Sequence, residues 1–197
     1  MIEMYFRPMY QDCIVNPIAR RILIAPEKIT YLACFSGILV APALMFHFIY
    51  TAIILLLISG FFDTLDGTVA RMTDGVSNVG SILDIMSDRI VEFSVIVGLF
   101  SVEPAHRAFA TLAMLGSCYL CVTSFLVVGI FSSNQSAKSF YYSPGLIERA
   151  EAFLFFIAMI IWSNYFLLLA FLFTGLVLLT SYWHIKQFID QLGSANK

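Results

Sequence analysis

Residues 63–88 read DTLDGTVARMTDGVSNVGSILDIMSD, and they place two pairs of aspartates at the junction of two long apolar runs. Asp63 and Asp66 are three residues apart near the end of the first run. Asp84 and Asp88 are four residues apart near the start of the second run. Residues three or four apart share one face of an α-helix. Each run therefore predicts a helix that carries its aspartates along a single face.

The segment between the two pairs contains Gly75 and is a short turn. Two helices joined by so short a turn are expected to be antiparallel neighbours, with all four aspartates near the same end. Like charges this close repel each other unless cations lie between them. Carboxylate oxygens suit hard ions such as Mg²⁺ or Mn²⁺, and four aspartates are enough for two such ions.

The rest of the chain is too apolar for a soluble domain. Of its 197 residues, 60% are hydrophobic and 12% are charged, whereas soluble domains have roughly 45–50% and ~25%. The net charge of −2 provides no large basic surface, so no nucleic-acid partner is expected. The apolar runs are long enough to cross the ~30 Å apolar core of a bilayer as helices. The composition therefore predicts an all-α, polytopic membrane protein.

We expect residues 1–25 to form an amphipathic juxtamembrane helix on the membrane surface, residues 26–190 to form a six-helix transmembrane domain, and residues 191–197 to be a polar tail. The six expected spans are 29–48, 49–73, 78–101, 106–132, 147–163 and 165–187. Six spans place both termini on one side. Basic residues gather on that side, and Arg107 falls on the other. Both termini and the aspartates are therefore expected on the cytoplasmic side of the inner (cell) membrane.

Small residues and an arginine adjoin the aspartates. Gly67 and Ala70 lie on the aspartate face of the first helix, and Gly80 lies one turn before the aspartates of the second. Missing side chains let a ligand approach a helix backbone closely. Arg71 can pair with phosphate oxygens. Metal ligands, small residues and an arginine together indicate phosphoryl-transfer chemistry.

The complete pattern resembles the signature of the CDP-alcohol phosphotransferase family, class I. From Asp63 to Asp88 it reads D-x2-D-G-x2-A-R-x8-G-x3-D-x3-D, and every fixed position matches. This family moves a substituted phosphate from a CDP-linked donor to an alcohol and releases CMP. The expected spans, termini and N-terminal surface helix also resemble the family, so the likeness extends over nearly the whole chain. The resemblance further implies a homodimer formed through the transmembrane helices.

The resemblance also implies roles for single residues. Asp63, Asp66 and Asp84 are expected to hold two divalent cations, Mg²⁺ or Mn²⁺, that clamp the donor diphosphate. Asp88 is expected to contact the metals and to act as the catalytic base that takes the proton of the acceptor hydroxyl. The expected wall around CDP comprises Asp66, Gly67, Ala70, Arg71, Ser77, Gly80 and Thr30.

Arg89 bears on the choice of acceptor. A basic residue directly after Asp88 resembles family members that use inositol phosphate or glycerol phosphate, and it suits an anionic acceptor. Lys138 and Arg149 are expected to join Arg89 around the acceptor phosphate. The alternatives are local pairing of Arg89 with Glu92, and ordinary positive-inside charge for the other two.

The favoured function is transfer of a phosphatidyl group from CDP-diacylglycerol to a small, polar, inositol-phosphate-like alcohol, with the bilayer as the site of reaction. A phosphatidylglycerophosphate synthase that uses glycerol 3-phosphate is the alternative within the family. A non-catalytic CDP-lipid binder and a divalent-cation transporter are alternatives of other classes. Production of CMP distinguishes the enzyme from both of these.

Other reactive residue types are expected to be structural. Cys118 and Cys121 form a CxxC inside an apolar run, without a second pair, and are expected to pack as small apolar side chains. Glu148 and Glu151 are expected to pair locally at a helix N-terminus. The three histidines lie near span ends and are expected to be polar interface residues: His47, His106 and His184.

Overall fold

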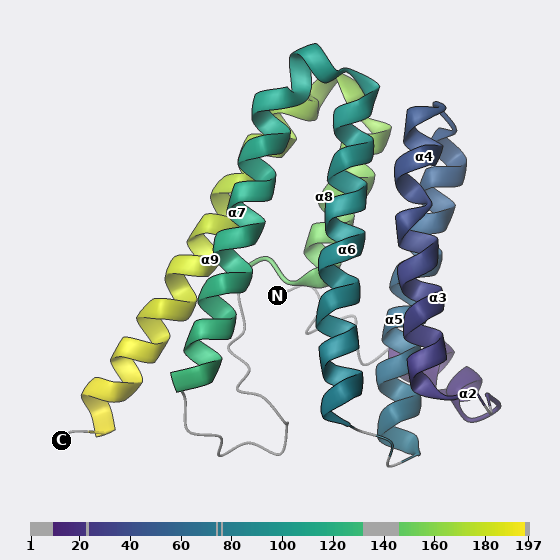
Figure 1. The fold of residues 1–197 in the computed structure, drawn as a ribbon, viewed down its shortest axis with the longest axis vertical. Helices are drawn as coiled ribbons and strands as arrows, with labels where there is room; N and C mark the ends of the chain where they lie inside the picture. The colour runs from purple at the N-terminus through teal and green to yellow at the C-terminus, as the bar shows by residue number, and fades with distance from the viewer. Residues whose placement is uncertain (1–9, 23, 74, 76, 132–145, 196–197) are drawn as a thin grey trace.

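The protein is a bundle of long helices (Figure 1). The computed structural model describes residues 10–22, 24–73, 75, 77–131 and 146–195, with side chains to residue 190. The long elements are α3 (Pro26–Ile38), α4 (Val40–Met45), α5 (Ile49–Met72), α6 (Asn78–Val102), α7 (Pro104–Phe131), α8 (Arg149–Ile161) and α9 (Phe166–Ala195). Each expected span overlaps one of these helices, or the pair α3 and α4. The prediction of an all-α fold is therefore confirmed for the described residues.

Prolines and turns set several of the helix boundaries. α3 begins at Pro26, whose fixed φ suits the first position of a helix. The break between α3 and α4 at Leu39 lies three residues before Pro42, which has no backbone N–H to donate to the carbonyl of Ile38. The expected tight turn between the last two spans is the 3₁₀ helix η2 (Ser163–Tyr165).

Four helical stretches in the described chain are long and apolar enough to cross a membrane: Pro26–Met45, Ile49–Met72, Pro104–Phe131 and Ser163–Asp190. α6 has sufficient length, but it carries four charged residues: Asp84, Asp88, Arg89 and Glu92. α8 has only 13 residues. Four of the six expected spans thus meet these criteria, and the chain is an integral membrane protein.

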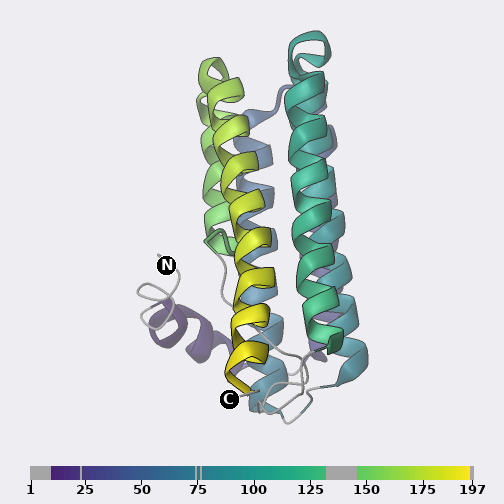
Figure 2. The ribbon, with the colours of Figure 1, turned by 90° about the vertical axis from the view of Figure 1, so that its left-hand side faces the viewer.

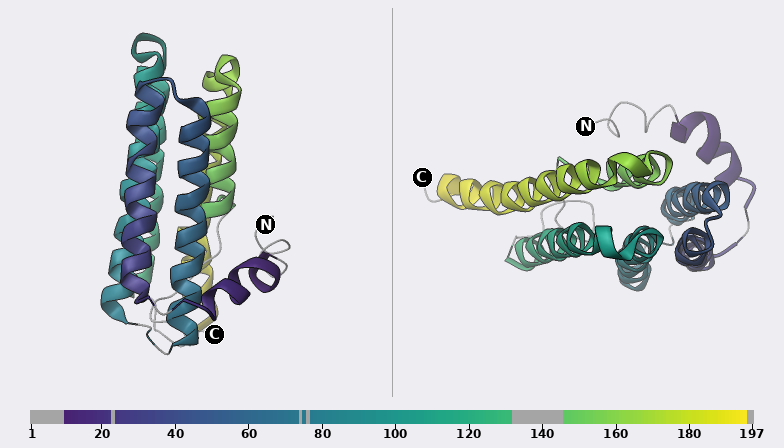
Figure 3. Two further views of the ribbon diagram at one scale, coloured as in Figure 1. Left: turned by 90° about the vertical axis from the view of Figure 1, so that its right-hand side faces the viewer. Right: turned by 90° about the horizontal axis from the view of Figure 1, so that it is seen from above.

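The described N-terminal segment crosses the end of the bundle at an angle to the long helices (Figure 3). It comprises η1 (Gln11–Val15), a π-helical turn, and α2 (Asn16–Ala19). Val15 and Ala19 are buried against α3 and α5, where they pack in one cluster with Ile29, Leu65 and Val69. Residues 1–9 of the expected amphipathic helix lie outside the described residues. At the other end, α9 continues to Ala195, so most of the expected tail is helical.

α5 and α6 are antiparallel, but they are not the close neighbours that the short turn predicts. α3 and α4 each pack against both of them, whereas α5 and α6 make little direct contact. Gly37 of α3 permits this arrangement, because a Cβ at that position would lie 2.3 Å from Cγ2 of Val91 in α6. The prediction of direct packing is therefore wrong, because α3 packs against both aspartate-bearing helices and keeps them apart.

The second half of the bundle is built on α7 and α9, which pack along each other (Figures 1 and 2). Figure 1 shows both helices diverging from α6 toward the end of the bundle that carries the aspartates. At the opposite end, Arg107 of α7 is 2% exposed and donates hydrogen bonds to the Leu99 carbonyl, at 3.2 Å, and to the Ser163 hydroxyl. Its guanidinium lies 4.2 Å from the Phe166 ring centroid. Arg107 thereby ties the α6–α7 turn to the α8–α9 turn.

Candidate active site

Three aspartates converge where α5 ends and α6 begins. One carboxylate oxygen from each of Asp63, Asp66 and Asp84 lies within 4.8 Å of the other two. Hard oxygen donors at this spacing fit a divalent cation such as Mg²⁺ or Mn²⁺. The predicted convergence of the two aspartate pairs is thus confirmed for three of the four residues, and the donor set is compatible with a metal site.

Thr30 fixes the most buried member of this cluster. Its hydroxyl donates to Oδ2 of Asp66 at 2.5 Å, and both residues are buried. Thr30 lies one turn into α3, so the helix that separates α5 from α6 also orients a carboxylate between them. A charge-assisted hydrogen bond of this kind is among the stronger ones in proteins.

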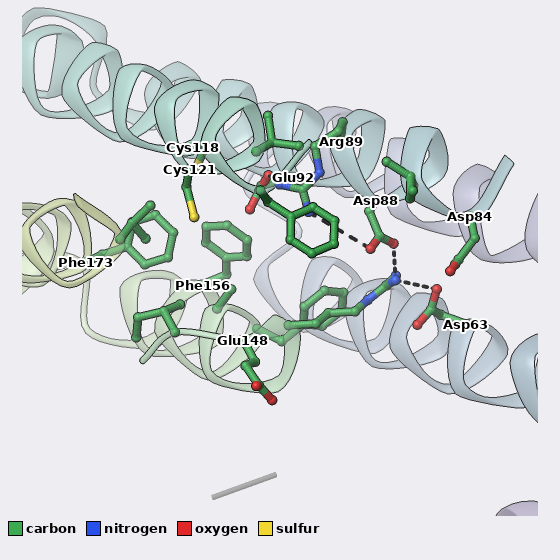
Figure 4. Close-up of a pocket in the computed structure, with 18 of the residues that line it drawn as sticks. Asp63, Asp84, Asp88, Arg89, Glu92, Cys118, Cys121, Glu148, Phe156 and Phe173 are labelled. Atoms are coloured by element: carbon green, nitrogen blue, oxygen red, sulfur yellow. Dashed lines mark hydrogen bonds and ion pairs between the residues drawn. The ribbon is translucent and has the colours of Figure 1, made fainter. Parts of the chain in front are cut away.

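The fourth aspartate has a different partner. Nη1 of Arg149, at the start of α8, donates both to Asp63 of α5 and to Asp88 of α6 (Figure 4). The guanidinium places one positive charge between two carboxylates and so links three helices. Asp88 lies outside the group of three, and its predicted part in metal binding stays a prediction.

The start of α8 is held by a reciprocal cap. The Glu148 side chain accepts from the backbone N–H of Glu151, and the Glu151 side chain accepts from the Glu148 N–H at 3.3 Å. Such a capping box satisfies two backbone donors that the helix leaves unpaired. The predicted local role of these glutamates is confirmed, and it fixes the position of Arg149 between them.

A first cavity of about 510 Å³ lies between α5 and α8, and we call it the α5–α8 cavity. Its polar end contains Asp63, Asp66 and Asp84 together with Gly67 and Arg71. The rest of its wall is mainly apolar and includes Leu57, Phe61, Phe153, Leu154 and Ile157.

The N-terminal segment also reaches this cavity. Tyr10 lines it, and burial raises the pKa of the Tyr10 phenol. Gln11 donates to the Thr68 hydroxyl at 3.2 Å, and Arg71 donates to the same oxygen at 3.2 Å. The segment before α3 is thus connected to an arginine of the cavity through one threonine.

A second cavity of about 430 Å³ is enclosed mainly by α6, α7, α8 and α9, and we call it the α6–α9 cavity. Its polar end comprises Asp63, Asp84, Asp88, Arg89, Glu92 and Arg149. Its inner wall includes Cys118, Cys121, Phe156 and Phe173 (Figure 4), together with Phe125 and His184. The two cavities share Asp63, Asp84, Arg149 and Phe153, so they meet at the carboxylates.

Most of the remaining residues predicted for the site do not line either cavity. Thr30, Ala70, Ser77 and Gly80 line neither of the two cavities. The Ser77 hydroxyl instead caps α6 by accepting from the Gly80 N–H at 2.9 Å. Lys138 lies outside the described residues. Arg89 lines the α6–α9 cavity and pairs with Glu92, so the local pairing is observed, while its role toward the acceptor phosphate stays a prediction.

Several residues of the α6–α9 cavity were not expected there. His184 is 6% exposed and lies beside Ser124, with 3.5 Å between Nδ1 and Oγ, so the prediction of an interface position is wrong for it. Cys118 and Cys121 pack as expected, but into a cavity wall. Their three-residue spacing places both thiols on one helix face. No local sequence pattern, however, indicates that this face meets α6 and α9.

A family model described as CDP-alcohol phosphatidyltransferase matches residues 23–183, which is most of the chain. The chain belongs to this family. The match includes both aspartate pairs, Arg71 and the capped start of α8, so the resemblance drawn from the signature is confirmed.

Two relatives and one solved structure illustrate the family. A phosphatidylinositol phosphate synthase of Corynebacterium glutamicum is 29% identical over 145 residues, covering 70% of this chain and 64% of the relative, just under two thirds of its length. Inner membrane protein YnjF of Escherichia coli is 26% identical over 190 residues, which cover 91% of this chain and 89% of the relative. The crystal structure of Mycobacterium tuberculosis phosphatidylinositol phosphate synthase with CDP-DAG bound has a TM-score of 0.72 at 21% sequence identity. The superposition covers 89% of this chain and 93% of the mycobacterial chain, and the two share the same fold.

Proposed function

We propose that this protein transfers a phosphatidyl group from CDP-diacylglycerol (CDP-DAG) to an inositol-phosphate-like alcohol and releases CMP. The observation that carries the proposal is that the α5–α8 and α6–α9 cavities meet at Asp63, Asp84 and Arg149. Direct transfer needs donor and acceptor on two sides of one phosphorus atom, and two adjoining cavities provide these places. The names of the corynebacterial and mycobacterial relatives support the choice of substrates.

In this proposal the α5–α8 cavity holds the donor. Its apolar wall, with Leu57, Leu154 and Ile157, suits acyl chains, while Gly67 and Arg71 lie at the end where the diphosphate belongs. The guanidinium of Arg71 pairs with phosphate oxygens. Ala70, Ser77, Gly80 and Thr30 complete the expected surroundings of CDP, with Thr30 acting through Asp66.

The α6–α9 cavity then holds the acceptor. Arg89 and Arg149 offer guanidinium groups to its phosphate, and Lys138 is proposed as a third cation. Asp88 lines the same cavity and so can reach the acceptor hydroxyl. Its carboxylate takes the hydroxyl proton as the oxygen attacks the donor phosphorus.

We assign two divalent cations, Mg²⁺ or Mn²⁺, to Asp63, Asp66, Asp84 and Asp88. When bound, they neutralise the charge of the diphosphate and of the departing CMP. The chain prepares the site by fixing Asp66 with Thr30 and by holding Asp63 and Asp88 close together through Arg149.

For the whole chain we propose six membrane spans, a homodimer formed through them, and both termini and the active site on the cytoplasmic side of the inner membrane. α6 and α8 complete the six, because both pack within the bundle formed by the four apolar stretches. The distribution of basic residues supports the orientation. The name of the Escherichia coli relative supports the inner membrane.

The test is CMP release by purified protein in detergent with CDP-DAG and Mn²⁺ or Mg²⁺. Inositol phosphate, glycerol 3-phosphate, inositol, serine and choline are supplied one at a time. We expect CMP with inositol phosphate, loss of activity in Asp88→Asn, and full activity in Asp190→Asn, which removes an exposed carboxylate near the end of α9.

Other outcomes identify the alternatives. CMP with glycerol 3-phosphate alone would make the protein a phosphatidylglycerophosphate synthase. Binding of CDP-DAG without CMP release for any of the five alcohols would contradict the proposed reaction and favour a CDP-lipid binder.

A further inference from the structure

Arg89 has two carboxylates within reach on its own helix. Its Nη1 lies 2.5 Å from Oε2 of Glu92, whereas its Nη2 lies 4.0 Å from Oδ2 of Asp88. The Glu92 and Asp88 side chains are 16% and 21% exposed, so both are largely shielded from solvent. Since attraction between charges falls with distance, Glu92 is the stronger partner.

Glu92 lies one helical turn beyond Asp88 and lines the α6–α9 cavity, farther from the aspartate cluster. Cys118 of α7 lines the same cavity. A shielded carboxylate is costly unless a cation and hydrogen bonds compensate it. The guanidinium of Arg89 provides this compensation for Glu92 within α6.

This anchoring decides the direction of the Arg89 side chain. Glu92 draws the guanidinium along the cavity wall, so that it contacts Glu92 at 2.5 Å but comes only within 4.0 Å of Asp88. Without the Glu92 carboxylate, Asp88 would be the nearest remaining anion on α6 for Arg89. The guanidinium would then approach the carboxylate that already contacts Arg149, and it would leave the part of the cavity proposed for the acceptor.

We propose that Glu92 is a positioning residue for acceptor recognition: it holds Arg89 against the wall of the α6–α9 cavity, where the guanidinium meets the acceptor phosphate, and it prevents a closer approach of Arg89 to Asp88 than the observed 4.0 Å. Glu92 itself contacts neither the donor nor the reacting atoms. This inference rests on the proposed function for the identity of the acceptor, but its geometry concerns Arg89 alone.

A double-mutant cycle tests the inference, because a residue that acts through Arg89 has no effect once Arg89 is gone. The variants are Glu92→Gln, Arg89→Gln, the pair together, and Glu92→Asp. Glu103→Gln is the matched control, since Glu103 also pairs with an arginine, at 3.6 Å, but at the far end of the bundle. The readouts are calorimetric binding of inositol 1-phosphate in the presence of Mn²⁺, and kcat and KM for each substrate.

We expect Glu92→Gln to raise the Kd and KM for inositol 1-phosphate about tenfold, to lower kcat, and to leave the KM for CDP-DAG unchanged. In the Arg89→Gln background the same change should have little further effect. Glu92→Asp keeps the charge and should recover part of the loss, while Glu103→Gln should match the wild type.

The inference would be overturned if Glu92→Gln weakened the binding of inositol 1-phosphate equally with and without Arg89, or in neither case. A parallel rise in the KM for CDP-DAG would also overturn it, because it would indicate general distortion of the site. If the wild type releases no CMP, the proposed function fails, but the calorimetric arm still tests Glu92. A wild type that neither binds inositol 1-phosphate nor releases CMP would overturn both.

Discussion

Arg149 contacts carboxylates of two helices and borders both cavities. Its guanidinium is planar and has several donors in a fixed arrangement, whereas a lysine ammonium is a compact point charge. The side chain can therefore face Asp63 and Asp88 together and still present donors to a phosphate. Because residues 63 and 149 are far apart in sequence, their spacing gave no indication of this contact.

Replacement of Arg149 by lysine tests this geometry. We expect Arg149→Lys to lower kcat/KM for a phosphorylated acceptor by roughly ten- to a hundredfold, because charge is retained but the paired contacts are lost. Arg149→Gln, which also removes the charge, should lower kcat/KM further. Steady-state CMP release measures both, with Lys186→Gln, an exposed position on α9, as the control. An Arg149→Lys protein as active as the wild type would contradict a role that requires the guanidinium.

Thr30 offers a second test at the scale of one atom. Thr30→Val keeps the shape of the side chain but removes the hydroxyl that donates to Asp66. We expect about tenfold more Mn²⁺ to be needed for half-maximal CMP release, since loss of a hydrogen bond to a charged group costs about 1.5–3 kcal/mol. Electron paramagnetic resonance of free Mn²⁺ measures binding independently of turnover.

The control for Thr30 is Thr174→Val, which removes a hydroxyl that donates only to the Ala170 carbonyl within α9, at 2.8 Å. An unchanged Mn²⁺ requirement in Thr30→Val would show that the hydrogen bond from Thr30 of α3 to Asp66 does not contribute to Mn²⁺ binding.

At the scale of helices, apolar runs and the spacing of Asp63, Asp66, Asp84 and Asp88 were enough to predict α5, α6 and the meeting of three of the four carboxylates. These signals are local, because helical periodicity places such residues on one face. The separation of α5 from α6 by α3 was not predicted, because it depends on a close approach at Gly37. The wall that contains Cys118 and His184 depends on how α7 and α9 pack, which no local pattern specifies.

Gly37 provides a prediction for this packing. A Cβ at position 37 would lie 2.3 Å from Val91 and 3.0 Å from the Ser59 hydroxyl, so Gly37→Ala must push α3 away from α6. Overpacking of this kind costs about 1–3 kcal/mol. We expect a lower Tm in detergent and reduced activity, since α3 also carries Thr30. Gly116→Ala is the control, because a Cβ there meets nothing within 4 Å. Equal Tm values for the two variants would argue against the tight contact.

At the scale of the whole molecule, the proposed chemistry lies at one end of the bundle, whereas Arg107 makes its contacts to Leu99 and Ser163 at the other. We expect Arg107→Met to lower the free energy of unfolding by about 1.5–3 kcal/mol, the contribution typical of hydrogen bonds to a charged group. The KM values should stay unchanged at temperatures where the variant is folded. Thermal unfolding and steady-state kinetics on the same preparations check both parts. A changed KM at full folding would show that the two ends are coupled.

The α5–α8 cavity has a rim in which Leu57 and Leu154 are 54% and 52% exposed. In the proposed reaction, a lipid donor that passes this rim arrives by lateral diffusion within the leaflet. The enzyme then responds to the mole fraction of donor among its neighbouring lipids and not to the amount per litre. Adding inert phospholipid at constant total donor should therefore slow turnover. Enzymes that use the same donor would compete for it within the plane of the membrane, where the local density of proteins and lipids limits how much donor reaches each enzyme.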